Sequence, residues 1–124
     1  MDKEKLKEGF LHIFKAAGYS LAGLATGLRL SLAFRQEAAV LVLLVVLLGV
    51  CGKPLTSWLI AIGAWLLVMM AELLNTAIEE ALNLITTDYN IHVKHDKDMA
   101  SAAVFLMLAL NAALWFCMFV LNLL

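Results

Sequence analysis

Charged residues are scarce in this sequence. Aspartate, glutamate, lysine and arginine together make up 15% of its 124 residues, whereas hydrophobic residues make up 64%. Soluble domains typically contain about 25% charged and about 45–50% apolar residues. The composition therefore excludes an ordinary soluble domain and indicates an integral membrane protein, which by its length is a single domain.

Cysteine and proline are also rare. Cys51 and Cys117 both lie in apolar runs, so the sequence indicates neither a disulfide framework nor a cysteine-based metal motif. The N-terminal run MDKEKLKEG is charged rather than apolar, so we expect no secretory signal peptide. The single proline belongs to GKP at 52–54, where glycine and proline interrupt the apolar pattern and indicate a turn.

Three apolar segments, residues 30–51, 55–85 and 99–124, are long enough to cross a membrane, which takes about 20 residues. In residues 5–28, by contrast, apolar residues recur at steps of three and four, with lysines toward the N-terminal end. This pattern is typical of an amphipathic helix at the membrane surface. We therefore predict an all-α membrane protein with an N-terminal surface helix and three transmembrane helices.

The basic residues are distributed unequally between the two sides of the predicted spans. Of the nine lysines and arginines, only Lys53 lies in the loop between the first two spans. The positive-inside rule then places the N-terminus and the loop 86–98 in the cytoplasm and the C-terminus outside. We expect Asp96 or Asp98 to cap the third membrane helix. Gly23 and Gly27 form G-x-x-x-G, a weak indication of close helix approach.

A polar stripe follows the apolar half of the second span, in AELLNTAIEEALN at 71–83. At about 100° per residue, one helix face carries Glu72, Asn75, Thr76, Glu79 and Asn83, with Glu80 about 80° away from Glu72. At about 1.5 Å per residue, Glu72 lies about 10 Å deeper in the membrane than Glu79. Charged side chains at membrane depth are costly and usually functional, so the two glutamates indicate a site.

The two depths favour two kinds of chemistry. A carboxylate in apolar surroundings holds a proton more readily, which suits Glu72 to the role of a general base. A carboxylate at the aqueous edge with other oxygen atoms nearby suits a hard cation such as Mg²⁺, which assigns the metal to Glu79. The structural alternative is a polar seam that joins helices, and we favour it for Asn75 and Thr76 taken alone.

Four segments together resemble a known family. KAAGYS (15–20), LAFRQEAAV (32–40), AELLNTAIE (71–79) and KDMASAAV (97–104) are similar, in order and spacing, to signature segments of the prokaryotic integral-membrane diacylglycerol kinases. The resemblance implies a homotrimer in the bacterial inner membrane, with active sites completed between subunits and no nucleic-acid partner. It also implies that the γ-phosphoryl group of ATP passes to the primary hydroxyl of diacylglycerol, giving phosphatidic acid, with Mg²⁺ required.

The resemblance also implies roles for individual residues. Glu72 matches the family's proposed base and Glu79 its metal-binding carboxylate. Besides Glu79, the positions implicated in holding the nucleotide are matched by Tyr19, Asn75, Asp88, Lys97 and Asp98. Positions that line the lipid side or support the site are matched by Arg35, Gln36, Glu37, Ser101 and Trp115. Phosphoryl transfer needs mostly positioning and charge neutralisation, so a small protein suffices.

The chain departs from the family pattern at Ser31. In RLSLAFRQE, Ser31 occupies the position where the family often has a second metal-binding carboxylate. A serine hydroxyl is a poorer Mg²⁺ ligand than a carboxylate, and Glu37 or Glu80 is the alternative second ligand. On the polar stripe, Asn83 replaces a common aspartate.

Other functions fit parts of the sequence. Related kinases that phosphorylate undecaprenol share the N-T-A-I-E block, so undecaprenol is the alternative acceptor, although R-Q-E after Phe34 favours diacylglycerol. A small transporter or ion relay would account for the buried carboxylates but not for the KDM segment or the surface helix. A purely structural or regulatory membrane subunit is the third interpretation, and it predicts that Glu72→Gln is harmless.

Overall fold

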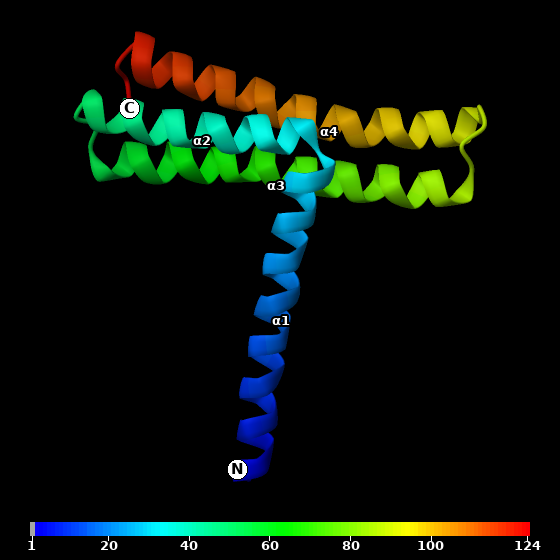
Figure 1. The fold of residues 1–124 in the computed structure, drawn as a ribbon. Coiled ribbons are helices and arrows are strands. Elements are labelled where there is room, and N and C mark those ends of the chain that lie inside the picture. Colours follow the sequence, from blue (N-terminus) through cyan, green and yellow to red (C-terminus); the bar gives the residue numbers. More distant parts are fainter. Residues whose placement is uncertain (1) are drawn as a thin grey trace.

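The computed structural model describes residues 2–124, and every regular element in that range is a helix (Figure 1). The elements are α1 (Lys3–Leu30), α2 (Leu32–Val50), α3 (Leu55–Ile85), α4 (Ile91–Trp115) and the π-helical turn η1 (Phe116–Val120). Three segments are long and apolar enough to cross a membrane, namely α2, α3 and the stretch Ile91–Val120. The prediction of an all-helical protein with three candidate spans is confirmed.

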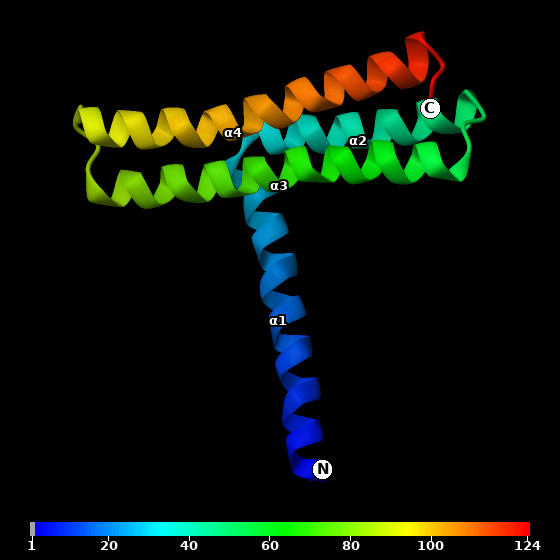
Figure 2. The same cartoon turned by 180° about the vertical axis from the view of Figure 1, so that it is seen from behind.

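The helices α2, α3 and α4 lie side by side, and α1 leaves this bundle crosswise (Figures 1 and 2). Because α3 is 31 residues long and α2 only 19, α3 and α4 extend beyond the start of α2. The junction between α1 and α2 therefore meets α3 near the middle of its length. The apolar half of α3 lies on one side of this junction and the polar stripe on the other.

Sequence-encoded caps set the beginnings of α3 and α4. Pro54 precedes α3 and follows Gly52, whose φ of 60° is accessible to glycine, so the expected turn at 52–54 is confirmed. The side chain of Asn90 accepts hydrogen bonds from the backbone N–H groups of His92 (2.9 Å) and Val93 (3.3 Å). The expected start at residue 99, with an aspartate cap at 96 or 98, is wrong because α4 begins at Ile91, where Asn90 caps the free N–H groups of His92 and Val93.

The apolar core lies in the half of the bundle that contains the 51–54 turn. Leu44 and Leu48 of α2 pack there against Ala61 and Val68 of α3 and Met118 of η1. All five side chains are almost fully buried. This packing holds the apolar half of α3 rigidly between its neighbours and thereby sets the position from which the polar stripe begins.

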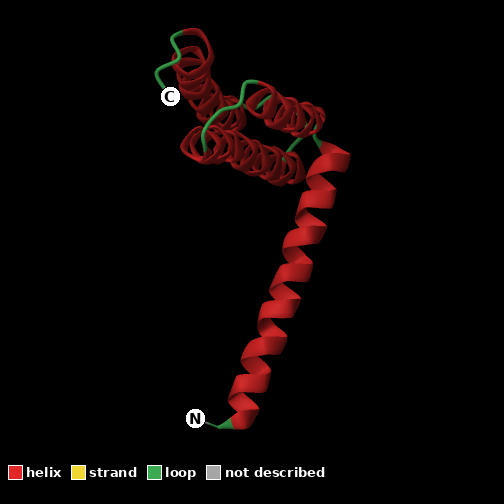
Figure 3. Ribbon diagram, turned by 90° about the vertical axis from the view of Figure 1, so that its left-hand side faces the viewer, coloured by secondary structure: helices red, strands yellow, loops and turns green. Residues whose placement is uncertain are grey.

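Close packing on one side of α1 lets it reach the bundle. Gly27 is its buried residue, and a Cβ atom at this position would collide with the Leu73 side chain of α3 and would lie 3.3 Å from the Phe34 ring. A Cβ atom at Gly23 would meet open space. Of the two glycines in G-x-x-x-G, only Gly27 therefore shows the expected close approach of helices. The rest of α1 extends away from the bundle (Figure 3). Its residues are exposed.

Ser31 and Arg35 shape the junction between α1 and α2. Ser31 has an extended backbone (φ −100°, ψ 119°), which ends α1, and its hydroxyl accepts a hydrogen bond from the Phe34 N–H (3.0 Å), which caps α2. The Arg35 guanidinium donates from Nη1 to the carbonyl oxygens of Leu28 (2.8 Å) and Arg29 (3.1 Å). A cation thus satisfies the free carbonyl groups at the end of α1, where the helix dipole favours positive charge.

Candidate active site

Glu72 is the centre of the site. It lies on α3 at the level of the α1–α2 junction and is only 6% exposed. Its Oε1 atom accepts hydrogen bonds from Ser31 Oγ (2.7 Å) and from Thr76 Oγ1 (3.3 Å). A buried carboxylate needs such donors, because an ionised oxygen without them would be strongly disfavoured away from water. The fold therefore supplies, within one chain, a buried carboxylate in a fixed orientation.

Glu37 is brought to the same place from α2. Its side chain is 7% exposed. In the described part of the chain, the Glu37 Oε2 atom is buried and has no hydrogen-bond partner. The Trp65 indole donates to the backbone oxygen of Glu37 (2.9 Å), which fixes α2 against α3 at this level. A buried oxygen without a donor is rare in native proteins and indicates a place for a further polar group.

The rest of the polar stripe divides between two neighbouring helices. Thr76 lies with Glu72 on the side of α1 and α2. Asn75 instead faces α4, where it lines a largely apolar hollow of about 470 Å³ together with Ala100, Ala103 and Met107. Its Oδ1 atom is buried there without a partner among the described residues. The single polar face expected from helical periodicity is therefore split by the packing of α4.

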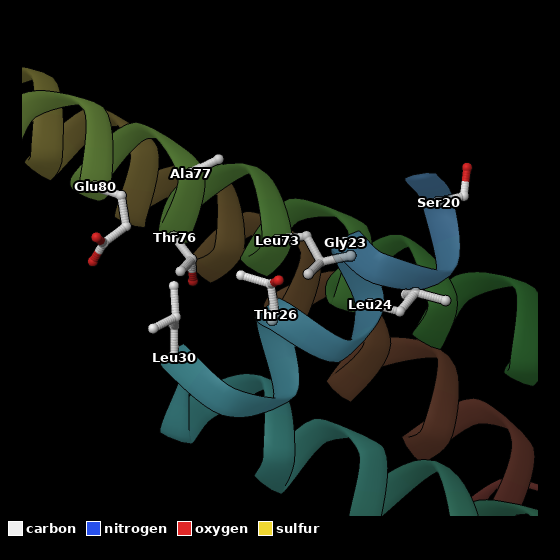
Figure 4. Close-up of a pocket in the computed structure, with 10 residues that line it drawn as sticks. Ser20, Gly23, Leu24, Thr26, Leu30, Leu73, Thr76, Ala77 and Glu80 are labelled. Atoms are coloured by element: carbon white, nitrogen blue, oxygen red, sulfur yellow. The ribbon is translucent and has the colours of Figure 1, made fainter. Parts of the chain in front are cut away.

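A groove of about 700 Å³ runs between the second half of α1 and α3 (Figure 4). Its α1 wall includes Ser20, Leu24, Thr26 and Leu30, and its α3 wall includes Leu73, Thr76, Ala77 and Glu80. Glu80 lies at the end of the groove that is remote from Ser20 (Figure 4). The groove is thus mainly apolar, with a carboxylate at one end and the Thr76 hydroxyl that binds Glu72 in its wall.

Several candidate nucleotide residues come together at the α3–α4 loop. Asp88, Lys97 and Asp98 line an open hollow of about 380 Å³. The Lys97 ammonium donates to Asn83 Oδ1 (2.7 Å), which places a cation at the outer end of the polar stripe. Glu79 is partly buried and lies two helical turns from Glu72, about 10 Å along the helix axis. The site therefore has an inner carboxylate and an outer group of charges.

Other candidate residues are not brought to this place. Tyr19 is 76% exposed on α1, and Gln36 and Ser101 are also exposed. Trp115 packs against Trp65, with ring centroids 5.0 Å apart, and so belongs to the aromatic part of the core. Within one chain, the nucleotide role of Tyr19 and the lipid-side roles of the other three residues stay predictions.

The oxygen atoms present suit a metal ion that arrives with a nucleotide. In residues 2–124, no three His, Cys, Asp or Glu side chains are grouped closely enough to hold a metal ion. Mg²⁺ is usually bound by one or two carboxylates together with substrate phosphates, so a single carboxylate such as that of Glu79 is enough for this mode of binding. Ser31, the other expected ligand, has its hydroxyl bonded to Glu72, and the role of Ser31 as a metal ligand stays a prediction.

Two residues outside the expected site support this arrangement. Asn111 of α4 is 1% exposed and donates from Nδ2 to the carbonyl oxygens of Ala64 (3.0 Å) and Met107 (2.9 Å). Trp65 links α2 to α3 through its bond to Glu37. Asn111 could have been found from the sequence, because it is an amide in an apolar span and polar side chains often join membrane helices.

Comparison with known proteins relates the chain to one family of proteins. The family described as "Prokaryotic diacylglycerol kinase" matches residues 18–119. A protein named diacylglycerol kinase from Escherichia coli K12 is 36% identical over 107 residues, which cover 86% of this chain and 88% of that protein. Proteins of the same name from Haemophilus influenzae and Pseudomonas aeruginosa are each 33% identical, over 86% and 90% of this chain and 91% and 90% of their own lengths.

Proposed function

The chain belongs to the prokaryotic diacylglycerol kinase family, and from that premise we propose how this lipid kinase phosphorylates diacylglycerol. The relatives are named diacylglycerol kinases, which supports diacylglycerol as the acceptor. That name does not favour undecaprenol as the acceptor or an ion relay as the function. The proposed reaction transfers the γ-phosphoryl group of ATP to the primary hydroxyl of diacylglycerol. Its products are phosphatidic acid and ADP.

The observation that carries the mechanism is the buried and hydrogen-bonded carboxylate of Glu72. Glu72 accepts the proton of the lipid hydroxyl while the hydroxyl oxygen forms a bond to the γ-phosphorus. The bond between that phosphorus and its bridging oxygen breaks, and ADP leaves with the electron pair. General-base help of this kind is worth about 10²–10⁴ in rate. Most of the remaining acceleration comes from holding the two substrates in line.

The outer charges hold the nucleotide in this proposal. Glu79 would hold the Mg²⁺ that accompanies ATP, and the ion would supply neutralisation of the phosphate charge. Lys97, already on the stripe through its bond to Asn83, contacts the phosphates as a cation. The remaining contacts to the nucleotide come from Tyr19, Asn75, Asp88 and Asp98, as the family resemblance implies. The separation of Glu72 from Glu79 lets a lipid hydroxyl and a water-soluble nucleotide meet at the membrane boundary.

An assay with two acceptors tests this function. Purified protein in detergent micelles receives ATP and Mg²⁺ with diacylglycerol, with undecaprenol, or with both together. We expect phosphatidic acid from the parent protein and a far lower rate from Glu72→Gln. Undecaprenyl phosphate as the main product would replace the acceptor, and phosphatidic acid formed by Glu72→Gln at the parental rate would reject the base.

The proposed placement in the membrane follows from α1. A crosswise helix with apolar and basic sides suits the surface of the membrane. In this proposal the α1–α2 junction and Glu72 lie at the level of that surface, and Glu79 lies further toward the water. Lys3 and Lys94 are then cytoplasmic and Lys53 is outside. Single cysteines at these three positions, in a variant that lacks Cys51 and Cys117, test it in intact cells. Only the cysteine at 53 should react with an impermeant reagent, and reaction at 94 would reverse the orientation.

We also propose a homotrimer with shared active sites. The hollow between α3 and α4, which Asn75 lines, supports a complex in which groups of another subunit complete the site. Mixed oligomers of Glu72→Gln and Glu79→Gln subunits test the sharing. Activity above that of either parent variant is expected if the two residues of one site come from different subunits. Full activity of a strictly monomeric protein would reject shared sites.

A further inference from the structure

One residue, Ser31, contacts three elements at the α1–α2 junction. The backbone N–H of Ser31 donates to the Gly27 oxygen (2.9 Å) at the end of α1, and its Oγ atom accepts from the Phe34 N–H (3.0 Å) at the start of α2. The single proton of that hydroxyl then points to α3, where it is donated to Glu72 Oε1 (2.7 Å). Ser31 is only 7% exposed, so solvent does not compete strongly for these bonds. The residue couples the junction directly to the carboxylate of the base.

The two oxygen atoms of Glu72 are unequal as a result. Oε1 accepts both described hydrogen bonds, from Ser31 at 2.7 Å and from Thr76 at 3.3 Å. In residues 2–124 no side-chain hydrogen bond is made to Oε2. A glutamate side chain has three rotatable bonds, and a bond to a fixed hydroxyl removes most of that freedom. Oε2 is therefore the oxygen that is left to approach a substrate, in an orientation set by Oε1.

We propose that Ser31 is a positioning residue that holds Glu72 Oε1, so that Glu72 Oε2 receives the proton of the lipid hydroxyl. This inference rests on the proposed role of Glu72 as the base. It gives Ser31 a function different from metal binding. Thr76, with a longer bond to the same oxygen, assists in holding it.

The location of Ser31 argues against a direct role in binding a metal ion. Its hydroxyl contacts Glu72, whereas Glu79, the proposed metal ligand, is about 10 Å further along α3. An acid at position 31 would point at the Glu72 carboxylate. Like charges in one buried place disfavour each other. The neutral hydroxyl can donate a proton to a carboxylate, and an ionised acid cannot.

Two effects of losing the hydroxyl oppose each other. Removing a donor from a carboxylate makes it a somewhat stronger base. The same loss frees the side chain to rotate, and a displacement of about 1 Å at a reacting group can lower a rate by about 10²-fold. The loss of orientation is the larger effect, so the turnover number should fall while binding of ATP at the outer charges is unaffected.

Four variants at position 31 test the role by steady-state kinetics. Ser31→Ala removes the donor and the cap, and we expect kcat to fall about ten-fold with an unchanged KM for ATP, as for the loss of a hydrogen bond to a charged group. Ser31→Thr keeps both and should stay within about two-fold of the parent. Ser31→Gly also removes the donor, but glycine at a cap position costs only a few tenths of a kcal/mol of stability. This variant therefore tests the role even if the alanine variant fails to fold. It should have the kcat of Ser31→Ala.

The fourth variant separates positioning from capping and from metal binding. Ser31→Asp restores an oxygen for the cap and offers a carboxylate to Mg²⁺, but it has no neutral donor for Glu72. Positioning predicts that Ser31→Asp is at least as slow as Ser31→Ala, with no gain in Mg²⁺ affinity. Recovery of the parental kcat, or a lower Mg²⁺ concentration for half-maximal rate, would overturn the proposal.

A double-mutant cycle with Glu72→Gln keeps this inference separate from the proposed function. If Ser31 acts through Glu72, Ser31→Ala lowers kcat in the parent and has no further effect in Glu72→Gln. An equal further fall in the Glu72→Gln background would overturn the positioning role. The parental kcat in Ser31→Ala, together with an inactive Glu72→Gln, would also overturn the positioning role of Ser31. The proposed role of Glu72 as the base would then still stand. Parental activity of Glu72→Gln would instead reject the proposed function itself.

Discussion

The two ends of the polar stripe on α3 are built differently. At the inner end, Glu72 is buried and receives hydrogen bonds from two hydroxyls of the same chain. At the outer end, Glu79 is partly buried, and the exposed Asn83 is bonded to Lys97, whose ammonium a ligand could attract. The inner end is organised before any substrate arrives, whereas the outer end is left open to be completed by a nucleotide or another subunit.

This difference matters because preorganised groups act without rearrangement when the reaction occurs. The lipid needs such an end, since its hydroxyl is weakly acidic and must be aligned with a base. The nucleotide brings its own charges and its own metal ion, so flexible cations and carboxylates are enough to bind it. Substitutions at the two ends should therefore differ in size and in the kinetic constant that they change.

The largest effect is expected at the inner end. Glu72→Gln keeps the shape and the acceptor oxygen of the side chain but removes its ability to take a proton, so kcat should fall by about 10²–10⁴. Its matched control is Glu79→Gln, which should change mainly the dependence on Mg²⁺ and ATP. Steady-state assays with each substrate varied in turn measure both. If Glu79→Gln loses kcat as Glu72→Gln does, with unchanged dependence on Mg²⁺ and ATP, the two ends are not distinct.

A smaller effect is expected at the outer end. Lys97→Gln removes the cation from the stripe, and the KM for ATP should rise about ten-fold, the usual scale for a hydrogen bond to a charged group. Lys94→Gln is the control, since Lys94 forms an exposed ion pair with Asp98 that is worth little. Its KM for ATP should stay within about two-fold of the parent. Equal effects at 94 and 97 would show that only the total charge at the start of α4 matters.

The sequence predicted the three spans because each is an apolar run of sufficient length, and helical periodicity predicted the polar stripe in part. It failed at the start of α4, where the polar run 91–98 suggested a loop, although Asn90 caps a helix there. Thr76, placed with Glu72 by spacing, indeed contacts it, while Asn75 is turned to α4 by packing. Spacing gives the angle of a side chain on its own helix, and only the neighbouring helices decide what that side chain meets.

The contact between Ser31 and Glu72 could not be predicted in this way. The two residues are 41 positions apart, and they meet because α1 ends at Ser31 and approaches α3 through Gly27. Family resemblance suggested a metal-binding role for position 31 from the acid that relatives often carry there. The serine of this chain makes a different contact, and the geometry of the junction is what reveals it.

The approach of α1 to α3 gives a third prediction, of smaller size. Gly27→Ala forces the Leu73 side chain to move, and overpacking of this kind costs about 1–3 kcal/mol of stability. Because the same junction carries Ser31, kcat should fall by a few-fold as well. Leu73→Ala opens space, so the double variant Gly27→Ala/Leu73→Ala should recover part of the stability lost by Gly27→Ala. A control, Gly23→Ala, meets open space and should behave as the parent.

Thermal unfolding in micelles and the lipid kinase assay measure both consequences. A Gly27→Ala protein with normal stability and normal kcat would show that α1 does not rest on α3 through this residue. Failure of the added Leu73→Ala change to restore any stability would place the collision elsewhere.

The smallest effect is expected at Asn111, which lies in the apolar half of the bundle and away from both ends of the stripe. Its Nδ2 atom donates to the carbonyl oxygens of Ala64 and Met107, while its Oδ1 atom is buried without a partner among the described residues. Interhelical hydrogen bonds of membrane proteins average about 0.6 kcal/mol, and a leucine of similar size also removes the unsatisfied oxygen. Asn111→Leu should therefore lower the free energy of unfolding by less than about 1 kcal/mol and leave kcat and both KM values unchanged. Denaturant titration in micelles, together with the kinetic assay, tests this prediction. A clear fall in kcat would mean that the packing of α3 against α4 affects the orientation of Glu72. The inner end would then depend on more of the fold than the hydroxyl groups that contact Glu72.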